Sequence, residues 1–123
     1  MTVTDYKTGK PVEPGSGYGE FDRLKMHSYR QQLLFYKLMV EHSRDYHSYT
    51  VASGTIAFVE PNKSGDIVSH TIGYDSDELA RFEKLIAIVW QKIMALDLPD
   101  TSGYEPTLKG VIQFEEDLLS GTI

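Results

Sequence analysis

An acid and an amine stand two residues apart near the start of the chain, in the run Thr4-Asp5-Tyr6-Lys7-Thr8-Gly9-Lys10. Residues two apart on a β-strand point to the same face, so Asp5 and Lys7 would project side by side while Tyr6 points the other way. A carboxylate is a hard oxygen ligand of the kind that Mg²⁺ or Mn²⁺ prefers. An ammonium can stabilise charge on a phosphoryl group or orient an attacking water. The competing interpretation is a plain ion pair, which the spacing alone favours.

A second motif pairs an amide with a phenol, in Gln32-Leu33-Leu34-Phe35-Tyr36. Gln32 and Tyr36 are four residues apart and lie on one side of a helix, with Ser28 on the same ridge. Both side chains can reach a phosphate or a base from there. The alternative is that Tyr36 belongs to the core and Gln32 is its solvated neighbour, and helix geometry alone favours this alternative.

Hydrophobic periodicity predicts the elements that must position these residues. A short strand over 2–6 leads through a Pro- and Gly-rich loop over 11–20 into a helix over 21–44. Strands over 49–60 and 66–74, joined by a turn, form a hairpin. A helix over 76–97 and a short amphipathic segment over 111–119 complete the chain. The predicted order is β-α-β-β-α plus a tail.

This order favours an α/β fold with a small mixed β-sheet flanked by helices. A helix between the first two strands indicates a right-handed crossover and parallel pairing. The first helix would pack through a seam at 3-4 spacing, and the second through a wider apolar stripe that includes Trp90 as a core residue. The seam of the first helix comprises Met26, Tyr29, Leu33, Tyr36 and Val40; that of the second comprises Leu79, Phe82, Ile86, Val89, Ile93 and Leu96.

Length and composition indicate one folded domain over residues 1–123. The chain has no cysteine, which excludes a disulfide scaffold, a thiolate metal site and a cysteine nucleophile. Its net charge of −6 argues against a protein that binds nucleic acid independently of sequence. Residues 1–40, however, carry six basic and four acidic side chains, so a polyanion would be expected to bind to that part of the chain. No signal peptide and no membrane-spanning run is evident. The absence of cysteines fits a cytoplasmic location.

Taken together, the two motifs resemble the RecB/AddB-type branch of the PD-(D/E)xK nucleases. The features that carry the resemblance are a strand ending in Asp-Tyr-Lys-Thr-Gly-Lys, a glycine-rich loop, and a helix with Gln-Leu-x-x-Tyr. That module is often the C-terminal nuclease domain of a UvrD-like DNA helicase. The resemblance implies a partial restriction-endonuclease-like core and metal-dependent hydrolysis of phosphodiester bonds in DNA.

Carried over residue by residue, the resemblance makes Asp5 a ligand of Mg²⁺ or Mn²⁺ and the main-chain carbonyl of Tyr6 a second ligand. It makes Lys7 the catalytic lysine, and it places Gln32 and Tyr36 along the DNA path. It also implies helicase domains as partners, in the same or a parent polypeptide.

Two features depart from the family pattern. Only four residues precede Asp5, so the strand with the family's first acidic ligand is not in the sequence, and the cysteines of the iron–sulfur members are missing. We therefore expect the C-terminal portion of a larger nuclease domain, inactive or nearly so alone. An open edge of the first strand could instead form a homo-oligomer.

Two other functions stay open at this stage. One is a non-catalytic DNA- or protein-binding module derived from a nuclease fold. The other is an unrelated small α/β protein in which the acid and the amine form an ion pair. Three aromatic residues outside the predicted core, Tyr18, Phe21 and Tyr104, could stack on nucleic-acid bases, although loop aromatics are common.

Overall fold

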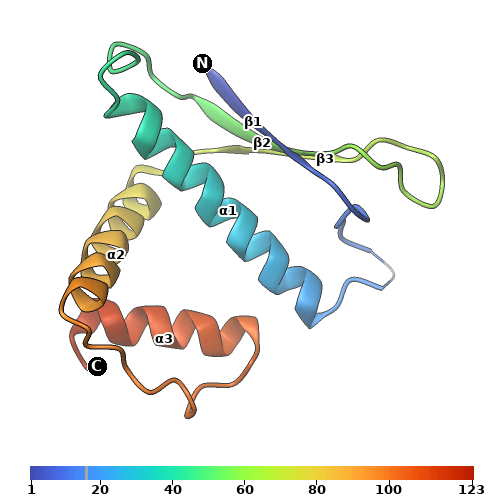
Figure 1. Cartoon of the computed structure of the whole chain (residues 1–123). Helices are drawn as coiled ribbons and strands as arrows, with labels where there is room; N and C mark the ends of the chain where they lie inside the picture. The colour runs from blue at the N-terminus through green and yellow to red at the C-terminus, as the bar shows by residue number, and fades with distance from the viewer. Residues whose placement is uncertain (16) are drawn as a thin grey trace. The chain divides into compact units, whose positions relative to one another are not determined.

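A computed structural model of the chain describes residues 1–15 and 17–123; Ser16, in the predicted loop, lies outside the described residues. The elements are β1 (Thr2–Lys7), α1 (Glu20–Glu41), β2 (Ser53–Phe58), β3 (Ser69–Gly73), α2 (Ser76–Met94) and α3 (Leu108–Ser120) (Figure 1). They belong to two compact units, residues 1–75 and 76–123, which are described separately below. The predicted order β-α-β-β-α is confirmed, and the amphipathic tail segment is a third helix.

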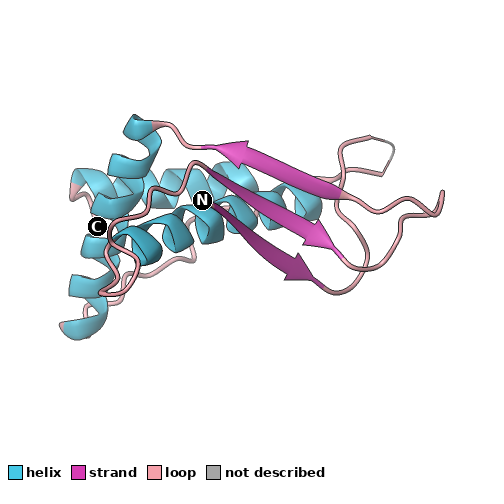
Figure 2. Cartoon of the chain, turned by 90° about the horizontal axis from the view of Figure 1, so that it is seen from above, coloured by secondary structure: helices cyan, strands magenta, loops and turns pink. Residues whose placement is uncertain are grey.

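The three strands form one mixed sheet in the order β1-β2-β3. Strand β1 runs parallel to β2, with Asp5 opposite Ile56 and Lys7 opposite Phe58, and β3 runs antiparallel to β2 (Figure 2). The parallel pair follows from the crossover through α1, since parallel neighbours cannot be joined by a tight turn. The α/β class and the mixed sheet are therefore confirmed.

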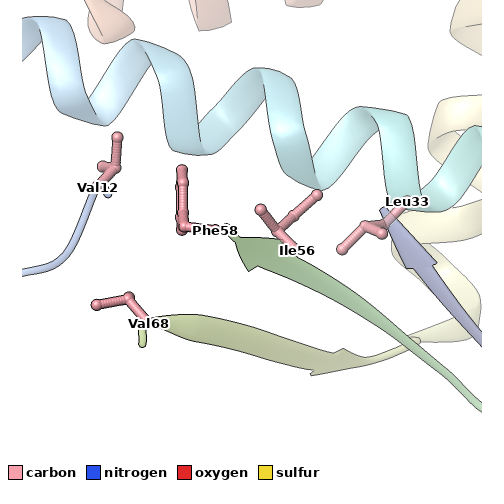
Figure 3. Close-up of a cluster of buried hydrophobic side chains, with 5 residues drawn as sticks. All are labelled: Val12, Leu33, Ile56, Phe58 and Val68. Atoms are coloured by element: carbon pink, nitrogen blue, oxygen red, sulfur yellow. The ribbon is translucent and has the colours of Figure 1, made fainter. Parts of the chain in front are cut away.

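Alternation along the strands separates a covered face from an open face. In β2, the side chains of Ile56 and Phe58 are buried, and β1 alternates exposed and partly covered residues in the same period of two. The covered face packs against α1 through Leu33, and Val68 and Val12 close the cluster (Figure 3). Val12 lies in the predicted loop, and its burial means that this part of the loop is fixed on the core.

Helix α1 comes close to the sheet because β2 has a glycine beneath it. A Cβ atom at Gly54 would lie 2.5 Å from the Tyr74 hydroxyl and 3.1 Å from a methyl group of Leu33. Tyr74 in turn donates a hydrogen bond to the Leu33 carbonyl, at 3.0 Å. At the other end of α1, the Gly19 N–H donates to the Asp22 carboxylate at 3.1 Å, which satisfies one of the free donors of the first turn.

A buried lysine fixes the C-terminal half of α1. Lys37 donates to the Glu41 carboxylate and to the Val51 carbonyl, both at 2.8 Å, and its ammonium lies 5.1 Å from the centre of the Tyr74 ring. The Val51 N–H donates to the same carboxylate oxygen of Glu41, at 3.3 Å. The segment that leads into β2 is thus tied to the helix that carries Gln32 and Tyr36.

In the second unit, Arg81 of α2 reaches the carboxylates of Glu115 and Glu116 on α3, at 3.5 and 2.6 Å. Thr107 caps the N-terminus of α3 by accepting a hydrogen bond from Gly110. The prediction that Trp90 is a core residue is wrong, because its side chain is 61% exposed. Three members of the predicted seam of this helix are exposed as well: Val89, Ile93 and Leu96. None of the helices in the described ranges has the length and apolar character to cross a membrane.

The outer edge of β1 has no partner strand among the residues that the structure describes. An edge of this kind presents unpaired N–H and C=O groups. The predictions that the chain is a single domain, a fragment of a larger one, or a homo-oligomer joined at this edge stay predictions.

Candidate functional site

Asp5 and Lys7 lie side by side on the covered face of β1, as their spacing predicts. The Lys7 ammonium is 2.9 Å from Asp5 Oδ2, and the two side chains are only 21% and 15% exposed. Because they are mostly shielded from water, their mutual attraction is screened less than that of a surface pair. The geometry is that of an ion pair held between a sheet and a helix.

The helix side of the pair comes from Gln32 and Tyr36. Lys7 donates a hydrogen bond to Gln32 Oε1, and the Tyr36 hydroxyl donates to Asp5 Oδ2 at 3.1 Å. The structure therefore brings together the four side chains that the two sequence motifs contribute. Tyr36 also packs against the core cluster, so it is both a core residue and a partner of Asp5.

Tyr29 is a fifth member of the cluster that sequence reasoning assigned only to the core. Its ring lies 5.0 Å from the Lys7 ammonium and packs edge-on against Phe58. A cation over an aromatic face is attracted by the ring's negative quadrupole. The feature of the sequence that could have identified Tyr29 as a member of the cluster is its position three residues before Gln32. This spacing places the two side chains on neighbouring parts of the helix surface.

The environment of Tyr36 favours the protonated form of its hydroxyl and raises its pKa. Burial raises the pKa of this phenol above its ordinary value, and the hydrogen bond to Asp5 and the negative charge of Asp5 raise it further. The positive charge of Lys7 opposes these effects and lowers the pKa in part. Tyr36 therefore acts as a stable hydrogen-bond donor that orients the Asp5 carboxylate.

The main-chain carbonyl of Tyr6 points away from β2. Met1 and Lys7 accept hydrogen bonds through their carbonyls from Ala52 and Val59, on the β2 side. Successive carbonyls of an extended strand alternate in direction, so the Tyr6 carbonyl faces the outer edge of β1. An open cleft of about 290 Å³ lies at this edge, lined by Val3, Thr4, Asp5, Tyr6 and Tyr36.

Two of the residues that line the cleft, Asp5 and Tyr6, carry oxygens of a type that suits a hard divalent cation. Both hydrogen bonds to Asp5 go to Oδ2, and none of the described residues donates to Oδ1. Together with the Tyr6 carbonyl, Oδ1 supplies oxygen ligands of the type that Mg²⁺ and Mn²⁺ use. Among residues 1–15 and 17–123, no cluster of three or more acidic, histidine or cysteine residues could hold a metal ion. The donor set fits such an ion in chemical type but is small in number.

The three aromatic residues outside the predicted core differ in their surroundings. Tyr18 packs against the core of the first unit. In the second unit, the Tyr104 hydroxyl donates to Asp117 at 2.6 Å and its ring contacts Phe114. Phe21, in the first turn of α1, is 68% exposed. Of the three, only Phe21 presents most of its surface to solvent.

Comparison with known proteins assigns the chain to a family. The family model described as the PD-(D/E)XK nuclease superfamily matches residues 1–105, which include the whole of the first unit, part of the second and all residues of the cluster. No curated protein and no solved structure matches the chain significantly.

Proposed function

This chain belongs to the PD-(D/E)XK nuclease superfamily, and from that membership we propose that it carries part of a Mg²⁺- or Mn²⁺-dependent DNA nuclease site. The observation that supports the proposal is the single cluster of Asp5, Lys7, Gln32 and Tyr36 beside an open strand edge. A match over residues 1–105 is at odds with the interpretation of an unrelated α/β protein.

In this proposal, Asp5 Oδ1 and the Tyr6 carbonyl hold the divalent ion. When bound, the ion would supply the acidification of a water ligand and offset negative charge on the phosphate. Tyr36 orients the Asp5 carboxylate through the hydrogen bond to Oδ2, which leaves Oδ1 directed elsewhere. Asp5 thus has separate oxygens for its helix partner and for the ion.

Lys7 is the group proposed to act on the phosphate or on the attacking water. Its ammonium is held by the Asp5 carboxylate, the Gln32 amide oxygen and the Tyr29 ring, so its position is restricted before substrate arrives. A preorganised cation stabilises developing negative charge without first having to reorient. Gln32 serves as a positioning residue for Lys7 and, with Tyr36, lines the DNA path.

The chain by itself is proposed to be inactive or nearly so. Asp5 contributes one carboxylate, whereas catalytic magnesium sites commonly combine two or more acidic groups. The residues that the structure describes contain no cluster of three or more His, Cys, Asp or Glu side chains that could hold a metal ion. A further acidic ligand, from a strand paired with the outer edge of β1, would complete the site. The cytoplasmic location and the association with a DNA repair helicase belong to the same proposal.

A non-catalytic module derived from a nuclease fold is the second candidate. It is favoured by the fact that Asp5 Oδ2 is already engaged by Lys7 and Tyr36, as in a purely structural ion pair. Such a module would bind DNA or a protein without any requirement for Asp5 Oδ1. The two functions therefore differ in whether Asp5 binds a metal ion.

Calorimetric titration with Mn²⁺ tests the proposed function. We expect the wild-type chain to bind one ion with a dissociation constant of about 10⁻⁴ to 10⁻³ M, the weak end of oxygen-ligand sites. Asp5→Asn should abolish binding while keeping the shape of the side chain. Asp66→Asn, which removes an exposed carboxylate in the turn between β2 and β3, is the matched control and should bind as the wild type does. Wild-type binding that survives in Asp5→Asn would contradict the assignment, and so would no binding at all.

A further inference from the structure

One surface ridge of α1 continues the cluster toward the N-terminus of the helix. Phe21, Lys25, Ser28 and Gln32 are spaced by 4, 3 and 4 residues, which keeps them on one side of a helix with 3.6 residues per turn. These four residues are called the α1 ridge. Gln32 contacts Lys7 of β1, so the side of the helix that carries the ridge is the side of β1.

The first turns of the ridge combine an exposed ring with a cation. The Phe21 ring is 68% exposed, and the Lys25 ammonium lies 4.9 Å from the ring centre. One face of the ring is thus associated with the ammonium, while most of the ring surface stays open to solvent. The open part of the ring offers a flat apolar surface on which an unpaired base can stack.

The acidic residues next to Phe21 in the sequence lie outside the α1 ridge. Glu20 and Asp22 each lie one residue from Phe21, which is about 100° around the helix. Asp22 accepts the hydrogen bond from Gly19, and a carboxylate oxygen of Glu20 lies 4.0 Å from Arg23. Lys25 is therefore the charged group that belongs to the ridge itself.

The dimensions of the ridge suit a short length of single-stranded DNA. Gln32 lies eleven positions after Phe21, which is a rise of about 16 Å along the helix. At about 3.4 Å for each stacked base, this distance corresponds to no more than about five nucleotides. Proteins that bind single strands combine cations along the backbone path with aromatic rings on which unpaired bases stack.

We propose that the α1 ridge is a binding subsite for a single DNA strand, in which an unpaired base stacks on Phe21 and a phosphate contacts Lys25. The strand would continue along the helix past Ser28 to Gln32 and the cleft at Asp5. The inference rests on the proposed nuclease function, because it assigns the substrate path of the same site. Inside a duplex, both faces of a base are covered by the neighbouring stacked bases. The subsite would therefore bind single-stranded DNA in preference to double-stranded DNA.

The test measures binding of a fluorescein-labelled oligothymidylate and of a duplex of equal length by fluorescence anisotropy, without divalent metal. Loss of one stacked base predicts that Phe21→Ala binds the single strand roughly 5- to 150-fold more weakly, and that Phe21→Tyr binds nearly as the wild type does. Tyr49→Ala, which removes another half-exposed ring from the same unit, is the matched control and should leave binding unchanged. Circular dichroism shows whether each variant is folded.

Lys25 has its own readout. Lys25→Gln should reduce the slope of log K against log salt concentration by about 0.7, because one phosphate contact on a single strand is lost. Lys63→Gln, an exposed lysine in the turn between β2 and β3, should leave the slope unchanged.

Three results would overturn the subsite. If Phe21→Ala binds the single strand as tightly as the wild type, the strand does not stack there, and the proposed function is untouched because it depends on Asp5 and Lys7. Equal dependence of duplex binding on Phe21 would refute the single-strand assignment. If the wild-type chain binds neither DNA, the subsite does not exist, and the manganese titration then judges the nuclease site separately.

Discussion

The Asp5–Lys7 pair allows a quantitative test of the site by a double-mutant cycle with Asp5→Asn and Lys7→Met. The N···O distance is 2.9 Å, and the side chains are 15% and 21% exposed. Exposed pairs contribute about 0.2–1 kcal/mol, whereas removing one partner of a buried pair costs about 3–5 kcal/mol. The observed shielding lies between these limits, so we expect a coupling free energy of about 1–2 kcal/mol.

The second unit supplies a control pair at the same distance. Lys92 and Asp97 are also 2.9 Å apart, but Asp97 is 67% exposed. The coupling free energy of this pair, measured with Lys92→Met and Asp97→Asn, should be no more than about 0.5 kcal/mol because water screens the two charges. The two pairs thus differ in shielding and not in separation.

The assay is urea unfolding followed by circular dichroism for the wild type, the single variants and the double variant of each pair. Lys7→Met also removes the contacts to Gln32 and Tyr29, and the cycle subtracts those losses because they occur in both the single and the double variant. A coupling of Asp5 with Lys7 no larger than that of Lys92 with Asp97 would refute the reasoning, since it would mean that the site pair is not shielded in solution.

Three further predictions concern other parts of the molecule. Lys37→Met should lower the free energy of unfolding by about 2–4 kcal/mol because it leaves the Glu41 carboxylate short of its cation, and adding Glu41→Gln should recover part of the loss in urea unfolding. Because the pKa of Tyr36 is raised in the folded state, its hydroxyl contributes stability that is fully present below pH 10, the ordinary tyrosine value, and is lost as pH rises through the higher folded pKa. The free energies of unfolding of the wild type and of Tyr36→Phe should therefore converge at alkaline pH. A difference between them that does not change with pH would contradict this. Gly110→Ala places a Cβ atom 1.9 Å from the Glu105 carbonyl oxygen and should lower the melting temperature clearly, whereas Gly103→Ala, with nothing within 4 Å, should not.

Local patterns were sufficient to predict the motifs and the elements that carry them. The 3.6-residue period of α1 placed Gln32 and Tyr36 on one side, and the two-residue period of β1 placed Asp5 beside Lys7. The crossover rule then predicted the parallel pair that brings the two elements together. The contacts of Gln32 with Lys7 and of Tyr36 with Asp5 were not predicted, because helix geometry alone favoured Tyr36 as a core residue and Gln32 as its solvated neighbour.

Contacts between segments distant in sequence could not be predicted in the same way. Lys37 is buried because the Val51 carbonyl and Glu41 satisfy its ammonium, and a single sequence does not show that the segment before β2 returns to this helix. Val12 is buried although Pro and Gly dominate its surroundings. Trp90 shows the opposite error, since periodicity identifies an apolar side of a helix but not whether another element covers it.

The most direct test of the account is to locate bound Mn²⁺ by paramagnetic broadening in amide NMR spectra of the labelled chain. If Asp5 and the Tyr6 carbonyl hold the ion, sub-stoichiometric Mn²⁺ should selectively broaden the resonances of Asp5, Tyr6 and Lys7. Asp5→Asn should abolish that broadening and leave the rest of the spectrum unchanged. Broadening centred elsewhere, or identical broadening in Asp5→Asn, would contradict the claim that this strand carries part of a metal-dependent nuclease site.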